Sequence, residues 1–228
     1  MSAAATVRTG GRAASRALLA GASLGLCAAG FAAVVQGALV PVRAEVAQIA
    51  LEHEFERNLD ENLRAVAAPS VATGRPIVVT AKLPLAMRPP TAPTAIAAGK
   101  PLARITVKRL GVKDVILAGP ASHDDLARGP MMLKRGDAQS PVTVLAAHRD
   151  THFLFVRDLR EGDVVTMQYV TGETERYRVT YFETVRWNRF AYPLDPPRPL
   201  LALTTCYPFG GTEYGGPWRR VAWAERIG

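Results

Sequence analysis

The chain has 228 residues, of which 48% are hydrophobic and 21% are charged, so it holds enough apolar material for a folded core and is not a disordered protein. Its formal net charge of +8 raises the question of nucleic-acid binding. The basic residues are spread along the chain, with no run of five or six Lys or Arg and no base-stacking aromatic motif, so the charge does not favour that function.

The N-terminal region is typical of a membrane anchor. Residues 1–16 form a basic segment, and the following residues 17–40, ALLAGASLGLCAAGFAAVVQGALV, carry no charge. About 20 apolar residues are enough for a helix to cross the hydrocarbon core of a membrane. Because arginines precede the span, we expect a cytoplasmic N-terminus and a catalytic or binding region outside the cytoplasm. A cleaved signal peptide is the competing interpretation, since residues 42–44, Val-Arg-Ala, resemble a cleavage site.

Two segments separate this span from the remainder of the chain. Residues 45–66 contain neither proline nor glycine and predict a juxtamembrane helix that packs or acts as a spacer. His53 lies among glutamates there, but adjacent residues on a helix point in different directions, so a metal site is not indicated. Residues 67–99 carry six prolines and no acidic residue. They predict an extended linker that holds the following domain off the membrane surface.

From about residue 100 to residue 228 the pattern changes to short strands separated by turns. Strands are predicted within 103–117 (two, broken at Leu110-Gly111), at 143–148, 163–170, 175–185, 199–205 and 219–226, with brief helices at 122–127 and 152–159. The strands at 163–170 and 175–185 form a hairpin around Thr171-Gly172. Seven or eight short strands without long alternating helices predict a mainly β fold, a closed or nearly closed β-barrel.

Three residues in this domain are candidates for chemistry. Cys206 lies where one predicted strand gives way to a loop, His148 follows another strand, and Arg219 lies in the strand after the cysteine. Acyl transfer by a thiol needs a sulfur that attacks a carbonyl, an imidazole that moves the proton, and a group that stabilises the oxyanion. A guanidinium keeps its charge at any working pH, so Arg219 can bind a carbonyl oxygen throughout such a reaction.

Taken one at a time, these residues are more often structural: a packed cysteine, a turn histidine and a solvated arginine. Cys27 lies inside the predicted span, so Cys206 is expected to be a free thiol and not half of a disulfide. His152 follows His148 by four residues, but no cysteine or carboxylate cluster completes a metal site. We therefore expect neither a metal nor a cofactor.

Three stretches together resemble the sortase family, the cysteine transpeptidases of bacterial surfaces, and especially its Gram-negative subfamily. They are AAHRDTHF at 146–153, ALTTC at 202–206 and GGPWRRVAWAE at 215–225. The family signature is Thr-Leu-x-Thr-Cys, and here Ala202 replaces the first Thr. The family histidine commonly follows Ala-Gly, and here it follows Ala146-Ala147. The resemblance covers about residues 100–228.

This resemblance implies an eight-stranded barrel that cleaves a C-terminal sorting signal similar to Leu-Pro-x-Thr-Gly and transfers the acyl group to an amine. It implies His148, Cys206 and Arg219 as the catalytic residues, with the following as supporting or substrate-binding residues: Thr205, Asp150, Arg149 and Arg220. Because strand side chains alternate between faces, only one of Arg219 and Arg220 should face the site, and we choose Arg219. The implied partners are a substrate protein with a sorting signal and an amine acceptor at the cell envelope, and the implied location is the inner membrane.

Two other classes of function are open alternatives. A murein transpeptidase would resemble Ser-His-Gly-Cys around its thiol and a papain-like protease Cys-Gly-Ser-Cys-Trp, and neither motif occurs. A non-catalytic, membrane-tethered binding domain on the same barrel is the second alternative. The joint presence of Cys206, His148 and Arg219 favours an enzyme.

Overall fold

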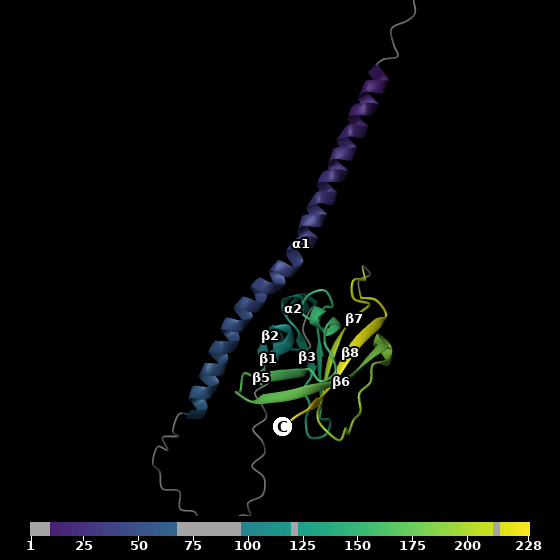
Figure 1. Ribbon diagram of the computed structural model, residues 1–228. Helices are drawn as coiled ribbons and strands as arrows, with labels where there is room; N and C mark the ends of the chain where they lie inside the picture. The colour runs from purple at the N-terminus through teal and green to yellow at the C-terminus, as the bar shows by residue number, and fades with distance from the viewer. Residues whose placement is uncertain (1–9, 68–96, 120–122, 212–214) are drawn as a thin grey trace, which may run out of the picture. The chain divides into compact units, whose positions relative to one another are not determined.

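The computed structural model describes residues 10–67, 97–119, 123–211 and 215–228 (Figure 1). The chain divides into two compact units, residues 1–43 and 44–228. The predicted linker at 67–99 lies outside the described residues except at its ends.

The described part of the first unit is helical. Helix α1 (Gly10–Ala67) begins there and runs through both of the helices predicted from the sequence, with Pro41 inside it. From Gly21 onward the helix is long and apolar enough to cross a membrane, and the side chains of its apolar window are exposed. A helix that is apolar on all sides is typical of a span surrounded by lipid.

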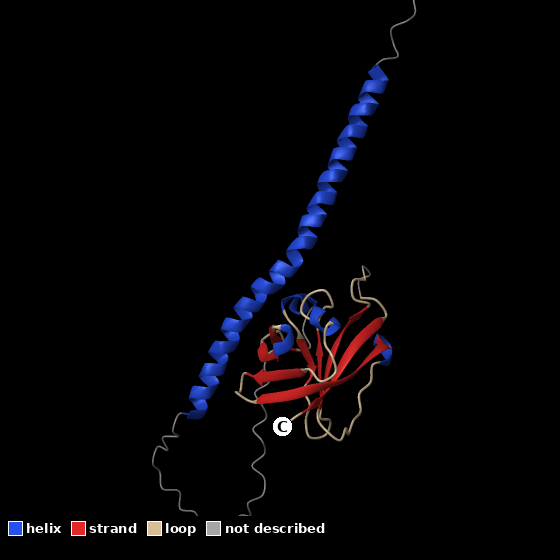
Figure 2. Ribbon diagram, in the orientation of Figure 1, coloured by secondary structure: helices blue, strands red, loops and turns tan. Residues whose placement is uncertain are grey.

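The second unit contains the predicted barrel, and the prediction of a closed, mainly β, eight-stranded fold is confirmed (Figure 2). The strands are β1 (Pro101–Val107), β2 (Val112–Ala118), β3 (Met131–Lys134), β4 (Val142–Ala146), β5 (Val164–Tyr169), β6 (Thr174–Arg186), β7 (Leu200–Tyr207) and β8 (Trp218–Arg226). The helical turns are α2 (His123–Arg128), η1 (Lys108–Leu110), η2 (Leu154–Arg157) and η3 (Trp187–Arg189). Around the barrel the strands follow the order β1-β2-β3-β4-β7-β8-β6-β5, and β5 closes on β1.

Glycines form the turns where the sequence predicted them. Gly111 follows η1 with φ +67° and Gly172 lies in the β5–β6 hairpin with φ +88°. Both values fall in the left-handed region, which glycine enters without a steric penalty from Cβ. The two turns therefore fix where β1 gives way to β2 and β5 to β6.

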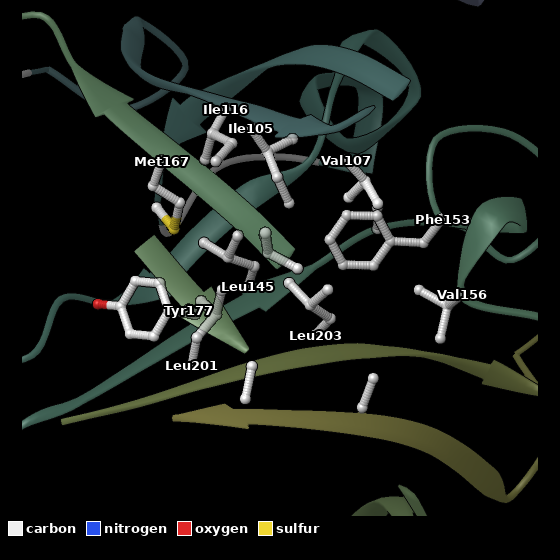
Figure 3. Close-up of a cluster of buried hydrophobic side chains, with 14 of the residues drawn as sticks. Ile105, Val107, Ile116, Leu145, Phe153, Val156, Met167, Tyr177, Leu201 and Leu203 are labelled. Carbon is white, nitrogen blue, oxygen red and sulfur yellow. The ribbon is translucent and has the colours of Figure 1, made fainter. Parts of the chain in front are cut away.

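The barrel interior is filled by alternate side chains of its strands (Figure 3). Leu145, Leu201 and Leu203 point inward from β4 and β7 and are fully or almost fully buried. Phe153, from the segment after β4, enters the same cluster with 0% exposure. Since neighbouring residues on a strand face opposite sides, the residues between these leucines lie on the outer face.

The outer face of β4, β7 and β8 carries a second apolar cluster, which we call the outer cluster: Val142, Val144, Leu200, Ala202, Val221 and Trp223. The connection between β6 and β7 packs against it through Phe190 and Tyr192. The ring of Phe190 stacks on Trp223 with centroids 6.1 Å apart. These contacts hold the β6–β7 connection beside the strands that carry the candidate site.

The C-terminal part of α1 packs on the barrel as an element of the second unit. Leu51, Phe55 and Leu59 are 2%, 0% and 6% exposed and form a third cluster with Val115, Leu117, Met131 and Val170. The arginine of β1, Arg104, lies over the Phe55 ring at 4.8 Å and pairs with Glu52 and Glu56. The helix predicted at 45–66 therefore packs against the barrel.

A buried polar side chain fixes the register of this helix. The Gln48 side-chain oxygen accepts a hydrogen bond from the Val115 N–H at 2.7 Å, and its amide donates to the Val115 carbonyl at 3.3 Å and to the Arg128 carbonyl at 3.0 Å. Strand β3 pairs with β2 only from Leu117 onward. Gln48 thus satisfies backbone groups at a stretch of β2 that β3 does not cover.

Replacing Phe55 with alanine should lower the free energy of unfolding of residues 44–228 by about 3 kcal/mol, because a fully buried ring is lost together with its cation–π contact. Chemical denaturation followed by tryptophan fluorescence measures this change. The matched control is Ile49→Ala on the same helix, where the side chain is 59% exposed and the change should be close to zero. Equal effects of the two substitutions would contradict the packing of this helix on the barrel.

Candidate active site

Three adjacent strands bring the candidate residues to one end of the barrel. Strand β7 lies between β4, to which it is parallel, and β8, to which it is antiparallel. Cys206 is the last but one residue of β7 and pairs directly with Arg219 of β8. Residues that oppose each other on neighbouring strands carry their side chains on the same face. The register therefore places the thiol and the Arg219 side chain on one face.

The two arginines of β8 lie on opposite faces. Arg220 pairs with Thr205. Thr205 is two residues after the inward-facing Leu203 of β7, so both Thr205 and Arg220 face inward. The Arg220 guanidinium lies 4.9 Å from the centroid of the Phe182 ring and is 3.4 Å from the Thr184 hydroxyl. Ala202 of β7 and Val221 of β8 belong to the outer cluster. Cys206 and Arg219 are an even number of positions away from them along the strand, so they lie on the same outer face. Only Arg219 shares a face with the thiol.

His148 follows the end of β4. The register of β4 with β7 runs from the pair Val142 and Leu200 to the pair Ala146 and Thr204, and the Ala147 N–H continues it by donating to the Thr204 carbonyl at 3.3 Å. Extending this register by one more residue pairs His148 with Cys206. Both residues are partly exposed, so a substrate can approach them from solvent.

Two polar contacts join the segment of His148 to the segment of Cys206. Thr205 is 2% exposed, and its hydroxyl donates to the Ala147 carbonyl at 2.8 Å. The Arg149 guanidinium donates to the Gly211 carbonyl in the β7–β8 connection at 2.5 Å. Each contact is made by a neighbour in sequence of a candidate catalytic residue. Thr205 and Arg149 therefore set the distance between the two segments.

The Arg219 guanidinium is held close to its own strand. Its Nη1 donates to the Gly216 carbonyl at 2.7 Å and to the Trp218 carbonyl at 2.9 Å. A guanidinium has five N–H groups, so it can keep these bonds and also donate to a substrate oxygen. Asp150, in contrast, is exposed on the loop that follows His148.

A cluster of buried ionisable groups lies at the start of β6. The end of β6 is the part near the site, because Val185 pairs with Arg219 there. Tyr169 and Tyr177 both donate to the Glu175 carboxylate, at 2.9 and 2.7 Å, and Arg226 pairs with it at 3.3 Å. Burial and the adjacent carboxylate raise the pKa of both tyrosines above the usual value. These phenols stay neutral and satisfy the buried carboxylate, which is a structural role.

Neither a metal cluster nor the cavity beside α1 coincides, within the described residues, with the site around Cys206. Among the described residues, no group of three or more His, Cys, Asp or Glu side chains is arranged to hold a metal. A shallow cavity of about 370 Å³ lies between α1 and β1, lined by Glu54, Asn58, Glu61, Asn62, Lys100, Pro101 and Val170. It shares no residue with the site around Cys206.

Sequence reasoning missed the backbone groups of this site. The Gly211 and Gly216 carbonyls accept hydrogen bonds from Arg149 and Arg219, and a backbone acceptor leaves no mark in residue type. The glycines of the β7–β8 connection were the available signal, because small residues let a side chain approach the backbone closely. At Gly211 an added Cβ would lie 3.1 Å from the Arg149 guanidinium.

Solved structures of known proteins share this fold. The sortase D5 transpeptidase of Clostridium perfringens has a TM-score of 0.52 and 16% identity, and the match covers 82% of this chain and 99% of that chain. Sortase C of Clostridium perfringens SM101 has a TM-score of 0.51 and 20% identity, covering 80% and 90%. Sortase A of Corynebacterium diphtheriae has a TM-score of 0.49 and 21% identity, covering 56% of this chain and 61% of that one, so the chain spans less than two thirds of its length. At such identities the likeness shows the fold alone.

Comparison of the sequence with curated proteins finds no significant match. The family model of the sortase domain matches residues 105–227. This match covers more than half of the chain and includes the strands and loops that carry His148, Cys206 and Arg219. The chain therefore belongs to the sortase family.

Proposed function

We propose that this protein is a membrane-anchored cysteine transpeptidase that cleaves a sorting signal similar to Leu-Pro-x-Thr-Gly and transfers the acyl group to an amine. The observation that carries the proposal is the common face of Cys206 and Arg219 on paired strands, with His148 at the end of the adjacent strand. These are the nucleophile, the oxyanion-stabilising group and the acid–base group that thiol acyl transfer needs.

The reaction has two balanced halves. The sulfur of Cys206 forms a bond to the Thr carbonyl carbon, and its proton passes to His148. The Thr–Gly amide bond then breaks, and His148 gives the proton to the departing glycine amine, which leaves a thioester. In the second half an acceptor amine attacks the same carbonyl carbon and gives a proton to His148. The C–S bond breaks and the proton returns to the sulfur.

Arg219 supplies the positive charge for the carbonyl oxygen. That oxygen becomes negative in each tetrahedral intermediate, and a preorganised donor stabilises this charge more than it stabilises the neutral substrate. The bonds from Arg219 to Gly216 and Trp218 hold the guanidinium at the rim of the site before substrate arrives. Thr205 and Arg149 act by positioning the segments of Cys206 and His148. We expect the exposed Asp150 and the inward-directed Arg220 to contribute little.

An exposed apolar side chain in the connection beside the site suits an apolar peptide. The outer cluster, on the face shared by Cys206, is itself covered by the β6–β7 connection, and Ala202 and Val221 are fully buried there. Leu194, in the same connection, is 72% exposed. Apolar side chains of a sorting signal, such as Leu and Pro, would lose contact with water against Leu194.

We also propose a cellular location and a subfamily for this protein. The apolar N-terminal helix and the basic residues before it support a single-pass anchor in the inner membrane, with a cytoplasmic N-terminus and a periplasmic catalytic domain. The segment from His148 to Phe153, HRDTHF, supports membership of the Gram-negative sortase subfamily. The partners would be a substrate protein with a C-terminal sorting signal and an envelope amine.

Incubating residues 44–228 with peptides of the Leu-Pro-x-Thr-Gly type should give an acyl-enzyme. The intact mass should rise by the mass of the peptide fragment that ends at Thr, because the thioester retains that fragment. Varying the first and third positions of the peptide reports specificity in the same experiment. The fragment begins at residue 44 because α1 packs on the barrel from Ala44 onward.

Adding a small amine to the acyl-enzyme should release the fragment as its amide. Hydroxylamine is a suitable probe because its product is distinguished by mass from the hydrolysis product. If a folded protein with a reduced thiol is acylated by no peptide of the series, the proposed transpeptidase is wrong in its substrate. A non-catalytic binding domain would bind such peptides without any change in covalent mass.

A further inference from the structure

We infer that His152 and Asp114 form a positioning pair that holds the His148 loop, residues 147–153, in place for catalysis. This inference rests on the proposed function, because it concerns the geometry of its acid–base residue. His152 is 7% exposed, and its ring lies between β2 and α2 and not in the site. It is a buried titratable group that the mechanism above does not use.

The loop is fixed at both ends by backbone bonds. At its start the Ala147 N–H donates to Thr204, and the Ala147 carbonyl accepts from the Thr205 hydroxyl. At its end the Phe153 N–H donates to the His148 carbonyl at 3.0 Å, and the Phe153 ring lies in the barrel interior. His152 directly precedes Phe153. Movement of His152 therefore changes the bond made to His148 itself.

The His152 ring joins this loop to two other elements. Its Nδ1 lies 3.5 Å from a carboxylate oxygen of Asp114 on β2, and its Nε2 lies 3.4 Å from the Ala127 carbonyl in α2. Asp114 is itself held in the sheet by pairing with Ile105 of β1. The ring thus ties the loop to the barrel wall on one side and to α2 on the other.

Both contacts of the ring are to acceptors. Each ring nitrogen lies next to one of these acceptors, and either nitrogen of an imidazole can carry the N–H that donates. An Asn side chain places a donor near the position of Nδ1 and a Gln side chain near that of Nε2, so each replaces one half of the interaction. Both nitrogens are directed at these partners, which assigns His152 a different role from a metal ligand paired with His148.

The test uses the full-length chain in detergent micelles and two measurements. In His152→Ala, hydrogen exchange of the Phe153 amide should become at least about tenfold faster, while the Leu203 amide in β7 keeps its rate. With a peptide that acylates the wild type, kcat should fall about 10- to 100-fold and KM should stay within about twofold, because the acid–base group is displaced while the peptide surface is intact. His152→Asn or His152→Gln should recover part of kcat.

The matched control is His53→Ala, which removes an exposed histidine from α1 and should change neither measurement. Should His152→Ala fail to fold, Asp114→Asn replaces it, with the same direction of change expected. The inference is overturned if a folded variant keeps wild-type exchange at Phe153, or if kcat is unchanged while exchange is faster. A wild-type chain that no peptide acylates would refute the proposed function instead, and the exchange measurement would still decide whether His152 holds the loop.

Discussion

Replacing Cys206 with alanine should abolish acyl-enzyme formation and lower the transpeptidation rate by at least about 10⁴-fold. The sulfur forms the covalent bond of the intermediate, and no neighbouring side chain can substitute for it. The other serious candidate for a nucleophile is excluded by position, because Cys27 lies within the apolar part of α1. Intact mass spectrometry detects the thioester, and a coupled peptide assay gives the rate.

The chain offers a matched control for this experiment in its second cysteine. Cys27→Ala in the full-length protein should leave both the acyl-enzyme and the rate unchanged. Cys206→Ser tests the thiol against an oxygen of nearly the same size and should also lose most of the activity, since a hydroxyl is a much weaker nucleophile at neutral pH. Residual acylation of Cys206→Ala would show that another residue is the nucleophile.

Replacing Arg219 with alanine should lower kcat/KM by about 10² to 10³-fold, the usual effect of removing one oxyanion-stabilising donor. The loss should appear mainly in kcat, because the charge on the carbonyl oxygen is largest in the transition state. Arg219→Lys keeps the charge but loses the planar arrangement of donors, so it should recover only part of the rate. Steady-state kinetics with the peptide substrate measure all three quantities.

Arg220→Ala is the control, because the neighbouring arginine points to the opposite face and stacks on Phe182. Its kcat/KM should stay within about threefold of wild type, with at most a small loss of stability from the cation–π contact. A larger loss for Arg220→Ala than for Arg219→Ala would reverse the assignment. The two substitutions remove the same side chain from adjacent residues, so a general effect of lost charge would affect both equally.

The sequence predicted the fold well because its signals are local. Turn glycines at Gly111 and Gly172 and apolar strands between them are read from short windows of sequence. Strand β3 was missed, because Met131–Lys134 has only four residues and no alternation that distinguishes it from a loop. Its pairing with β2 and β4 comes from the closure of the barrel, which depends on residues far apart in the chain.

The helix at 45–66 shows that apolar residues alone do not identify the buried face of a helix. Its apolar residues include Phe55 and Leu59, which are buried, but also Val46, Ile49 and Leu63, which are 62%, 59% and 48% exposed. The buried stripe follows Gln48, Leu51, Phe55 and Leu59. Gln48 is polar because it bonds the backbone of β2, so hydropathy alone cannot identify it as buried. The partner that makes a polar residue suitable for the interior is invisible in a local window.

For the site, sequence patterns identified residue types and the resemblance to the sortase family selected Arg219, whose role stays a prediction. The structure adds the pairing of Cys206 with Arg219 and the contacts that fix the loops. Asp114 could not be connected with the His148 loop from the sequence, because β2 and β4 lie apart in the chain and meet His152 only in the folded barrel.

The contact between Gln48 and β2 also bears on solubility. An uncovered strand edge offers unpaired N–H and C=O groups on which a second chain can add a strand. In this protein a side-chain amide occupies both groups of Val115, and Leu51 and Phe55 cover the apolar surface around Leu117 and Met131. A shortened chain that begins after Ala67 would expose this edge and surface together. Its copies should associate through β2, so the C-terminal part of α1 protects the barrel against aggregation.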